Sequence, residues 1–93
     1  MIRATIFVRG QVQGVGFRWW TRARALELGL VGHARNTADG RVEGVAQGPE
    51  QAVAALETLL REEPSRHGRP GRVDSCAVQH GIPREDLRGF VER

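Results

Sequence analysis

The sequence predicts an α/β sandwich of the α+β class, in which two helices cover one face of a four-stranded antiparallel sheet. Three observations support this prediction. Apolar residues alternate with a period of two at the start of the chain, recur every three to four residues in two later segments, and turn signals separate these segments. The 93 residues are enough for one domain, residues 1–93, with one hydrophobic core.

The first strand, the loop after it and the first helix are predicted at the start of the chain. Residues 2–10 alternate between apolar and polar positions, so one face of this strand packs on the core. A glycine-bearing loop follows over residues 11–16. A helix comes next, and Gly29 suits the left-handed position that ends it. The apolar stripe of this helix consists of Phe17, Trp20, Thr21, Ala25 and Leu28.

A hairpin and a second helix are predicted next. Residues 30–36 and 41–47 have the pattern of two strands, and an Asp-Gly turn joins them. The second helix opens with Pro49 in its first helical position and an acidic residue in its first turn. This helix ends before Pro64, because the residue that precedes a proline disfavours helical geometry.

The last part of the chain predicts a polar loop over residues 65–72, a fourth strand over residues 73–79 and a possible short fifth strand over residues 89–93 at the sheet edge. The predicted order is β-α-β-β-α-β, the split βαβ arrangement of ferredoxin-like folds. Right-handed crossovers place both helices on the same face of the sheet. This architecture hosts many unrelated activities, so the fold alone does not identify a function.

The composition excludes several kinds of chemistry. All fourteen basic residues are arginines, so the chain has no lysine for a Schiff base or a Walker-type phosphate site. Its one cysteine, Cys76, cannot form an intramolecular disulfide, and we expect it to fill apolar space in a late strand. The three histidines lie apart, without the spacing of metal ligands, and we expect no metal site.

Charge and hydropathy predict where the protein works. No apolar run approaches the ~20 residues of a membrane span, and the first residues lack the apolar block of a signal peptide. We therefore expect a cytoplasmic protein that does not bind a membrane. The formal net charge of +3 favours anionic ligands through long-range attraction, although an arginine-biased genome would produce the same charge.

The stretch from Gly10 to Arg18, GQVQGVGFR, predicts an anion site. A glycine loop before a helix turns main-chain N–H groups outward, and the helix dipole adds positive potential. Gly14 and Gly16 allow the main chain to bend sharply, and Arg18 can donate two hydrogen bonds to phosphate oxygens. Such loops and surface arginines are also common without a ligand, so this stretch alone leaves both interpretations open.

Asn36 lies where the second predicted strand runs into its turn. Its side-chain amide can accept a hydrogen bond from water and donate one to an oxyanion. The alternative is that Asn36 only shapes the hairpin turn, a common role of asparagine. In the predicted topology the first strand neighbours the third and the second pairs with the third. Asn36 and the glycine loop therefore approach the same edge of the sheet.

Two segments resemble the signature segments of the acylphosphatase family. They are VRGQVQGVGFR at residues 8–18 and GHARNTADGRVEGVAQG at residues 32–48. Two long motifs in this order, in a chain of this length, are highly specific. The resemblance implies the ferredoxin-like fold and an acylphosphatase activity, which is the hydrolysis of the carboxyl–phosphate bond of acyl phosphates.

The resemblance also implies roles for individual residues. Asn36 would position the attacking water. No metal or organic cofactor would be needed, and the partner would be a small-molecule acyl phosphate. Apart from the resemblance, the sequence shows no obvious exposed apolar seam, so we expect a monomer, and we expect no nucleic-acid partner. The phosphate would be bound by the guanidinium of Arg18 and by the main-chain N–H groups of Gln13, Gly14, Val15, Gly16, Phe17 and Arg18.

Three positions depart from the family pattern. His33 replaces the usual aromatic residue, which concerns packing rather than chemistry. Residues 63–72 are longer and richer in arginine, so we expect an enlarged surface loop there. Glu92 replaces an apolar residue, so the last strand is expected to be short.

Two other functions fit parts of the sequence. A ferredoxin-like sheet with an isoelectric point of about 10.9 can bind nucleic acid, but such modules display paired aromatic residues on central strands, and here Phe7 stands alone. Acylphosphatase-like domains also occur in larger proteins that handle carbamoyl phosphate. A metal chaperone of this fold class is excluded, because the chain has no Cys-x-x-Cys pair.

Overall fold

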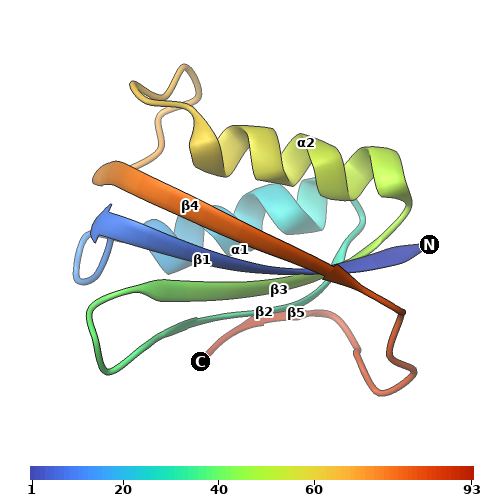
Figure 1. Cartoon of the computed structure of the whole chain (residues 1–93). Helices are drawn as coiled ribbons and strands as arrows, with labels where there is room; N and C mark the ends of the chain where they lie inside the picture. The colour runs from blue at the N-terminus through green and yellow to red at the C-terminus, as the bar shows by residue number, and fades with distance from the viewer.

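The computed structural model contains two helices and a five-stranded sheet, and both helices lie against one face of that sheet (Figure 1). The predicted order β-α-β-β-α-β is confirmed, and the possible fifth strand forms. In chain order the elements are β1 (Ile2–Gln11), α1 (Phe17–Glu27), β2 (Val31–Asn36), β3 (Val42–Gly48), α2 (Glu50–Arg61), β4 (Arg72–Gly81) and β5 (Phe90–Glu92).

The strand order in the sheet is β4-β1-β3-β2-β5. The first four strands of this order pair in the antiparallel sense, as predicted. β5 pairs with β2 in the parallel sense, with Phe90 opposite Gly32, so the complete sheet is mixed. β4 ends at the same end of the sheet at which β2 begins, and β5 starts from that end too, so β5 runs in the same direction as β2.

The hydrophobic core lies between the helices and the covered face of the sheet. From β1 it takes Ile6 and Val8, which alternate with more exposed neighbours as a period of two requires. From α1 it takes Trp20, whereas the adjacent Trp19 is 61% exposed. Only one of the two adjacent tryptophans therefore packs inside. α2 adds Val53, Leu56 and Leu60.

Several predicted boundaries needed correction. Pro49 is the N-cap of α2 rather than its first helical residue, because its ψ of 143° is extended. β4 is longer than predicted, since it pairs with β1 from Arg72 to Gly81. α1 ends as predicted, and Gly29 follows it with a φ of 73° in the left-handed region.

Segments that are distant in the sequence lie together along one edge of the sheet, the edge that is formed by strand ends and turns rather than by an outermost strand. The end of β1, the turn between β2 and β3, and the start of β4 all lie at this edge (Figure 1). The register places Val8 opposite Val42 and Val42 opposite Asn36, so a row of residues crosses β1, β3 and β2 close to the edge. α1 also begins here, directly after the loop that leaves β1.

Candidate active site

The loop between β1 and α1, residues 12–16, is called the cradle loop below. Two of its glycines have left-handed main-chain conformations, with a φ of 74° at Gly14 and 87° at Gly16. A side chain is strained in this region, which glycine adopts at no steric cost. Gly16 is also the N-cap of α1. The two glycines therefore let the chain curl tightly from the sheet into the helix.

The main-chain N–H groups around this loop have no partner in the protein. No hydrogen bond has the amide of any residue from Gln13 to Arg18 as its donor. The first bond of α1 runs from the Trp20 N–H to the Gly16 carbonyl oxygen at 3.0 Å. Free amides at a helix N-terminus carry partial positive charge. This run of six amides is the kind of site that binds a phosphate or a carboxylate.

Arg18 lies in the first turn of α1 with its side chain half-buried. Its Nη1 donates a hydrogen bond to the main-chain oxygen of Arg93, and the Arg93 N–H donates to the carbonyl oxygen of Ala34 on β2 at 2.8 Å. The guanidinium is thus connected to β2 through the end of the chain. Arg18 also lines a small hollow of about 60 Å³ together with Val12, Gly14, Gly16, Phe17, Trp19 and Glu92.

Asn36 is the last residue of β2 and is exposed. Ala34, two residues earlier on the same strand, is fully buried in the core beneath the helices. Residues two apart on a strand point to the same face, so the Asn36 side chain lies on the helix-covered side, at the edge where the cradle loop leaves β1. Its side chain has no hydrogen-bond partner in the protein.

The hairpin turn after Asn36 holds itself together without the Asn36 side chain. The Thr37 N–H donates to the Arg41 carbonyl oxygen at 2.8 Å, and the Arg41 N–H donates to the Thr37 Oγ1 at 3.0 Å. Hydrogen bonds from Thr37 and Arg41 also lower the pKa of Asp39 to about 2, so this carboxylate is ionised at neutral pH. Thr37, Asp39 and Arg41 supply the hydrogen bonds that stabilise the turn, so the Asn36 side-chain amide is not needed for it.

Gln13 connects the cradle loop to this hairpin. Its side-chain Nε2 donates to the carbonyl oxygens of Thr37 at 2.9 Å and Arg41 at 2.8 Å. The family resemblance implies a role only for the main-chain N–H of Gln13, and the sequence does not predict this side-chain bridge. The spacing of 24 and 28 residues between the partners carries no local signal, and only the topology of the sheet brings them together.

The three histidines and Cys76 do not gather into one cluster. No group of three or more His, Cys, Asp or Glu side chains comes together. Each histidine pairs with a single glutamate, and Cys76 is half-buried with its pKa raised, chiefly by burial, which fits its predicted packing role. No helix has the length and apolar character that crossing a membrane would require.

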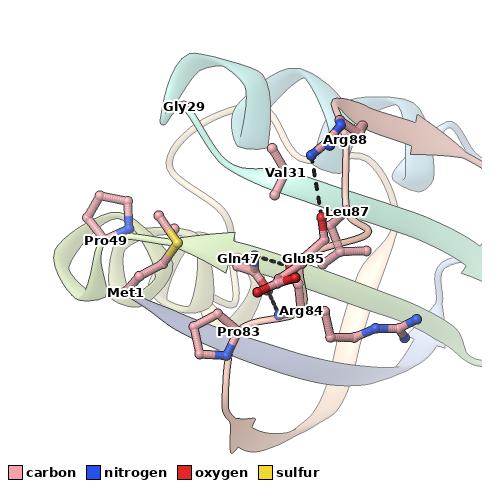
Figure 2. Close-up of a pocket in the computed structure, with 11 residues that line it drawn as sticks. Met1, Gly29, Val31, Gln47, Pro49, Pro83, Arg84, Glu85, Leu87 and Arg88 are labelled. Carbon is pink, nitrogen blue, oxygen red and sulfur yellow. Dashed lines mark hydrogen bonds between the residues drawn. The ribbon is translucent and has the colours of Figure 1, made fainter.

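A larger cavity of about 440 Å³ lies at the opposite end of the sheet (Figure 2). Met1, Pro49 and Pro83 line it, and the Gln47 side chain crosses its floor, where it donates to the Arg84 carbonyl oxygen at 2.8 Å and accepts from the Arg84 N–H at 2.7 Å. These bonds use both ends of the Gln47 amide. None of the predicted site residues lines this cavity, so it is separate from the candidate active site.

Fold and site together define a class: a small ferredoxin-like α+β protein with an open amide cradle, an arginine and an asparagine at one edge of its sheet. A sequence model of the acylphosphatase family matches residues 4–91. An acylphosphatase of Mycobacterium avium strain 104 is 57% identical over 98% of this chain and 94% of its own length. The chain therefore belongs to the acylphosphatase family, whose members are enzymes that hydrolyse acyl phosphates.

Solved structures agree with this assignment. The crystal structure of acylphosphatase from Bacillus subtilis superposes with a TM-score of 0.87 and 32% identity, covering 100% of this chain and 99% of that one. The crystal structure of T. kodakarensis HypF matches with a TM-score of 0.74 and 30% identity, but this chain covers only 12% of it. The predicted family, fold class and enzyme class are confirmed, and the nucleic-acid alternative is not favoured.

Proposed function

We propose that this acylphosphatase binds the phosphate of its substrate with the Arg18 guanidinium and the main-chain N–H groups of residues 13–18, and that Asn36 positions the attacking water. The observation that carries the proposal is the run of six unbonded amides beside Arg18 at the start of α1. In a family that acts on acyl phosphates, this run is a ready site for the tetrahedral anion.

The chemistry needs few groups. Hydrolysis of an acyl phosphate releases a carboxylate, whose conjugate acid has a low pKa of ~4, so the leaving group needs no general acid. Phosphoryl transfer to water passes through a loose transition state, and the protein contributes mainly positioning and charge stabilisation. Preorganised amides and a guanidinium supply that stabilisation without reorganisation during the reaction.

Asn36 supplies orientation rather than basicity. A neutral amide takes up no proton near neutral pH, but its oxygen can accept a hydrogen bond from water and its NH₂ group can donate one. Aligning the water opposite the leaving oxygen lowers the entropic part of the barrier. The Asn36 amide has no competing partner in the protein and stands at the same sheet edge as the cradle loop.

Turnover of benzoyl phosphate by the purified protein in the presence of EDTA tests this proposal. Arg18→Ala and Asn36→Ala should each lower kcat/KM by at least ~10²-fold, in line with the loss of one transition-state donor. The matched control is Arg35→Ala, next to Asn36 in sequence but exposed and paired with Glu43. Wild-type turnover in either site variant, with an unchanged far-UV spectrum, would reject that residue's role.

We also propose that residues 1–93 form one acylphosphatase-like domain that works as a cytoplasmic monomer, without a cofactor and without binding nucleic acid. Size-exclusion chromatography with light scattering tests the oligomeric state. Cell fractionation tests the location, and a gel shift at low salt tests nucleic-acid binding. Comparing acetyl, benzoyl and carbamoyl phosphate as substrates separates a general acylphosphatase from a carbamoyl-phosphate-handling relative.

A further inference from the structure

The segment between α2 and β4, residues 62–71, lies against the cradle loop; it is called the clamped segment below. A β-carbon at Gly71 would lie 1.9 Å from the main-chain oxygen of Gln11 and 3.1 Å from Cγ2 of Val15. At the last residue of the loop, a β-carbon at Gly16 would lie 3.9 Å from Cγ of Pro70. The main chain at Gly71 therefore rests directly on the point where β1 becomes the cradle loop.

Arg69 fixes the clamped segment to the rest of the protein. Its guanidinium is fully buried, and Nη1 donates to the carbonyl oxygens of Leu59 at 2.9 Å and Leu60 at 3.3 Å at the end of α2. Its Nη2 donates to Glu63 Oε2 at 2.6 Å, and the same oxygen accepts the Val73 N–H at 2.9 Å. One arginine thus joins the end of α2, the start of the clamped segment and the start of β4.

Apart from Val12, which is buried in the core, the cradle loop has few other supports. Its free amides form no bond that would hold its shape, and Gln13 anchors it only on the side of the β2–β3 hairpin. On the β4 side, the contacts come from the pairing of Gln11 with Arg72 and from Gly71 and Pro70. The position of the amides on this side therefore depends on where the clamped segment lies.

We propose that the clamped segment, held by Arg69, sets the position of the cradle loop and thereby the affinity of the site for phosphate. This inference rests on the proposed function. Arg69 and Gly71 act as positioning residues, since they hold the loop rather than touch the substrate. A displacement of about 1 Å in a positioning element is enough to cost up to ~10²-fold in rate.

Two glycines of the same segment give a matched test. Gly71 and Gly68 have similar left-handed φ angles, 79° and 72°, so alanine introduces comparable main-chain strain at both. A β-carbon at Gly68 meets no atom within 4 Å, whereas one at Gly71 meets the cradle loop. Gly71→Ala therefore displaces the loop, and Gly68→Ala adds the strain without the displacement.

The measurements are KM for benzoyl phosphate, the inhibition constant of inorganic phosphate, and amide NMR shifts of residues 13–18 during a phosphate titration. We expect Gly71→Ala to raise KM and the inhibition constant by ~10-fold or more, and Gly68→Ala to leave both near wild type. Equal phosphate affinity in the two variants would overturn the proposal.

Arg69→Lys provides a second test if Gly71→Ala does not fold. Lysine keeps the charge but cannot bond both helix carbonyls and Glu63 with a planar fork. We expect a higher KM with a smaller change in kcat, whereas the exposed Arg66→Lys should match wild type. A KM in Arg69→Lys equal to that of the wild-type protein would also overturn the inference.

Failure of the proposed function would look different. If the unmutated protein does not hydrolyse benzoyl phosphate, the proposed function is rejected, and the phosphate titration still compares the phosphate affinity of the loop variants.

Discussion

The Arg18 guanidinium already has one partner in the protein, the main-chain oxygen of Arg93. A guanidinium has five N–H donors, so this one bond restrains Nη1 and leaves the other donors for a ligand. The Asn36 amide is different, because no protein group restrains it. Under the proposed function, the substrate phosphate would meet a guanidinium that is already restrained, whereas the Asn36 amide would take its final orientation only when the site is occupied.

His33 makes stability depend on pH. Burial, and then the nearby Arg93 charge, lower its pKa below the ordinary value of 6.5, and the attraction of Glu43 offsets this only in part. The folded protein therefore binds the proton more weakly than the unfolded chain, and stability falls as the pH drops below about 6.5.

Replacing His33 removes this pH dependence. In His33→Phe, the difference between the free energies of unfolding at pH 7.5 and pH 5.5 should be smaller than in wild type, because the proton linkage at this position is lost. Urea unfolding at the two pH values measures it. The pKa of Glu43 is lowered chiefly by Arg35, so the titration of Glu43 affects stability only below its ordinary pKa of 4.5, which lies outside the range from pH 5.5 to pH 7.5. An undiminished difference in the variant would contradict the assignment.

At the scale of elements, Gln13 joins the β2–β3 hairpin and the cradle loop by two hydrogen bonds. Gln13→Ala removes both bonds and should lower kcat by ~10-fold, because Asn36 and the amides lose their fixed separation. Gln11→Ala is the matched control, since the Gln11 side chain is exposed and forms no hydrogen bond. Benzoyl phosphate turnover compares the two, and equal activities would show that the bridge does not matter.

Much of this level of structure follows from the sequence, for physical reasons. The period-two pattern of Ile6 and Val8, the helical stripe ending near Gly29 and the Asp-Gly turn are local signals, and each predicted element forms. Pro49 fits either the first helical position or the N-cap, and only its ψ angle decides. The parallel pairing of β5 and the Gln13 bridge depend on partners far along the chain, where local patterns carry no information.

The candidate site shows the same division. The sharp bends at Gly14 and Gly16 and the place of Arg18 at the start of a helix could be predicted, because a glycine loop that leads into an apolar helical stripe is a local sequence pattern. The contact of Gly71 with the cradle loop could not be predicted, because the clamped segment is polar and has only the pattern of a surface loop. The structural role of Arg69, which is buried in the clamped segment, can be seen only from the carbonyl and carboxylate groups that it contacts.

At the scale of the whole molecule, one core supports the entire fold, and the two adjacent tryptophans test it. Trp20 is 4% exposed, whereas Trp19 points to solvent. Trp20→Ala should lower the free energy of unfolding by ~3–5 kcal/mol, since it leaves a large cavity, and Trp19→Ala should change it by no more than ~0.5 kcal/mol. Chemical denaturation followed by circular dichroism measures both, and similar losses would contradict the packing described.

The central place of β1 has a consequence for how activity is acquired. β1, at residues 2–11, is hydrogen-bonded on one side to β3 and on the other to β4, which starts only at residue 72. Pairing between strands this far apart in the sequence slows folding, because the chain loses conformational entropy before the strand contacts can stabilise it. The amides that we propose to bind phosphate follow β1 directly, so they reach their final places only after these remote strands have paired. The rate at which hydrolysis recovers after dilution from denaturant would therefore report the rate at which the pairing of β1 with β3 and β4 is completed.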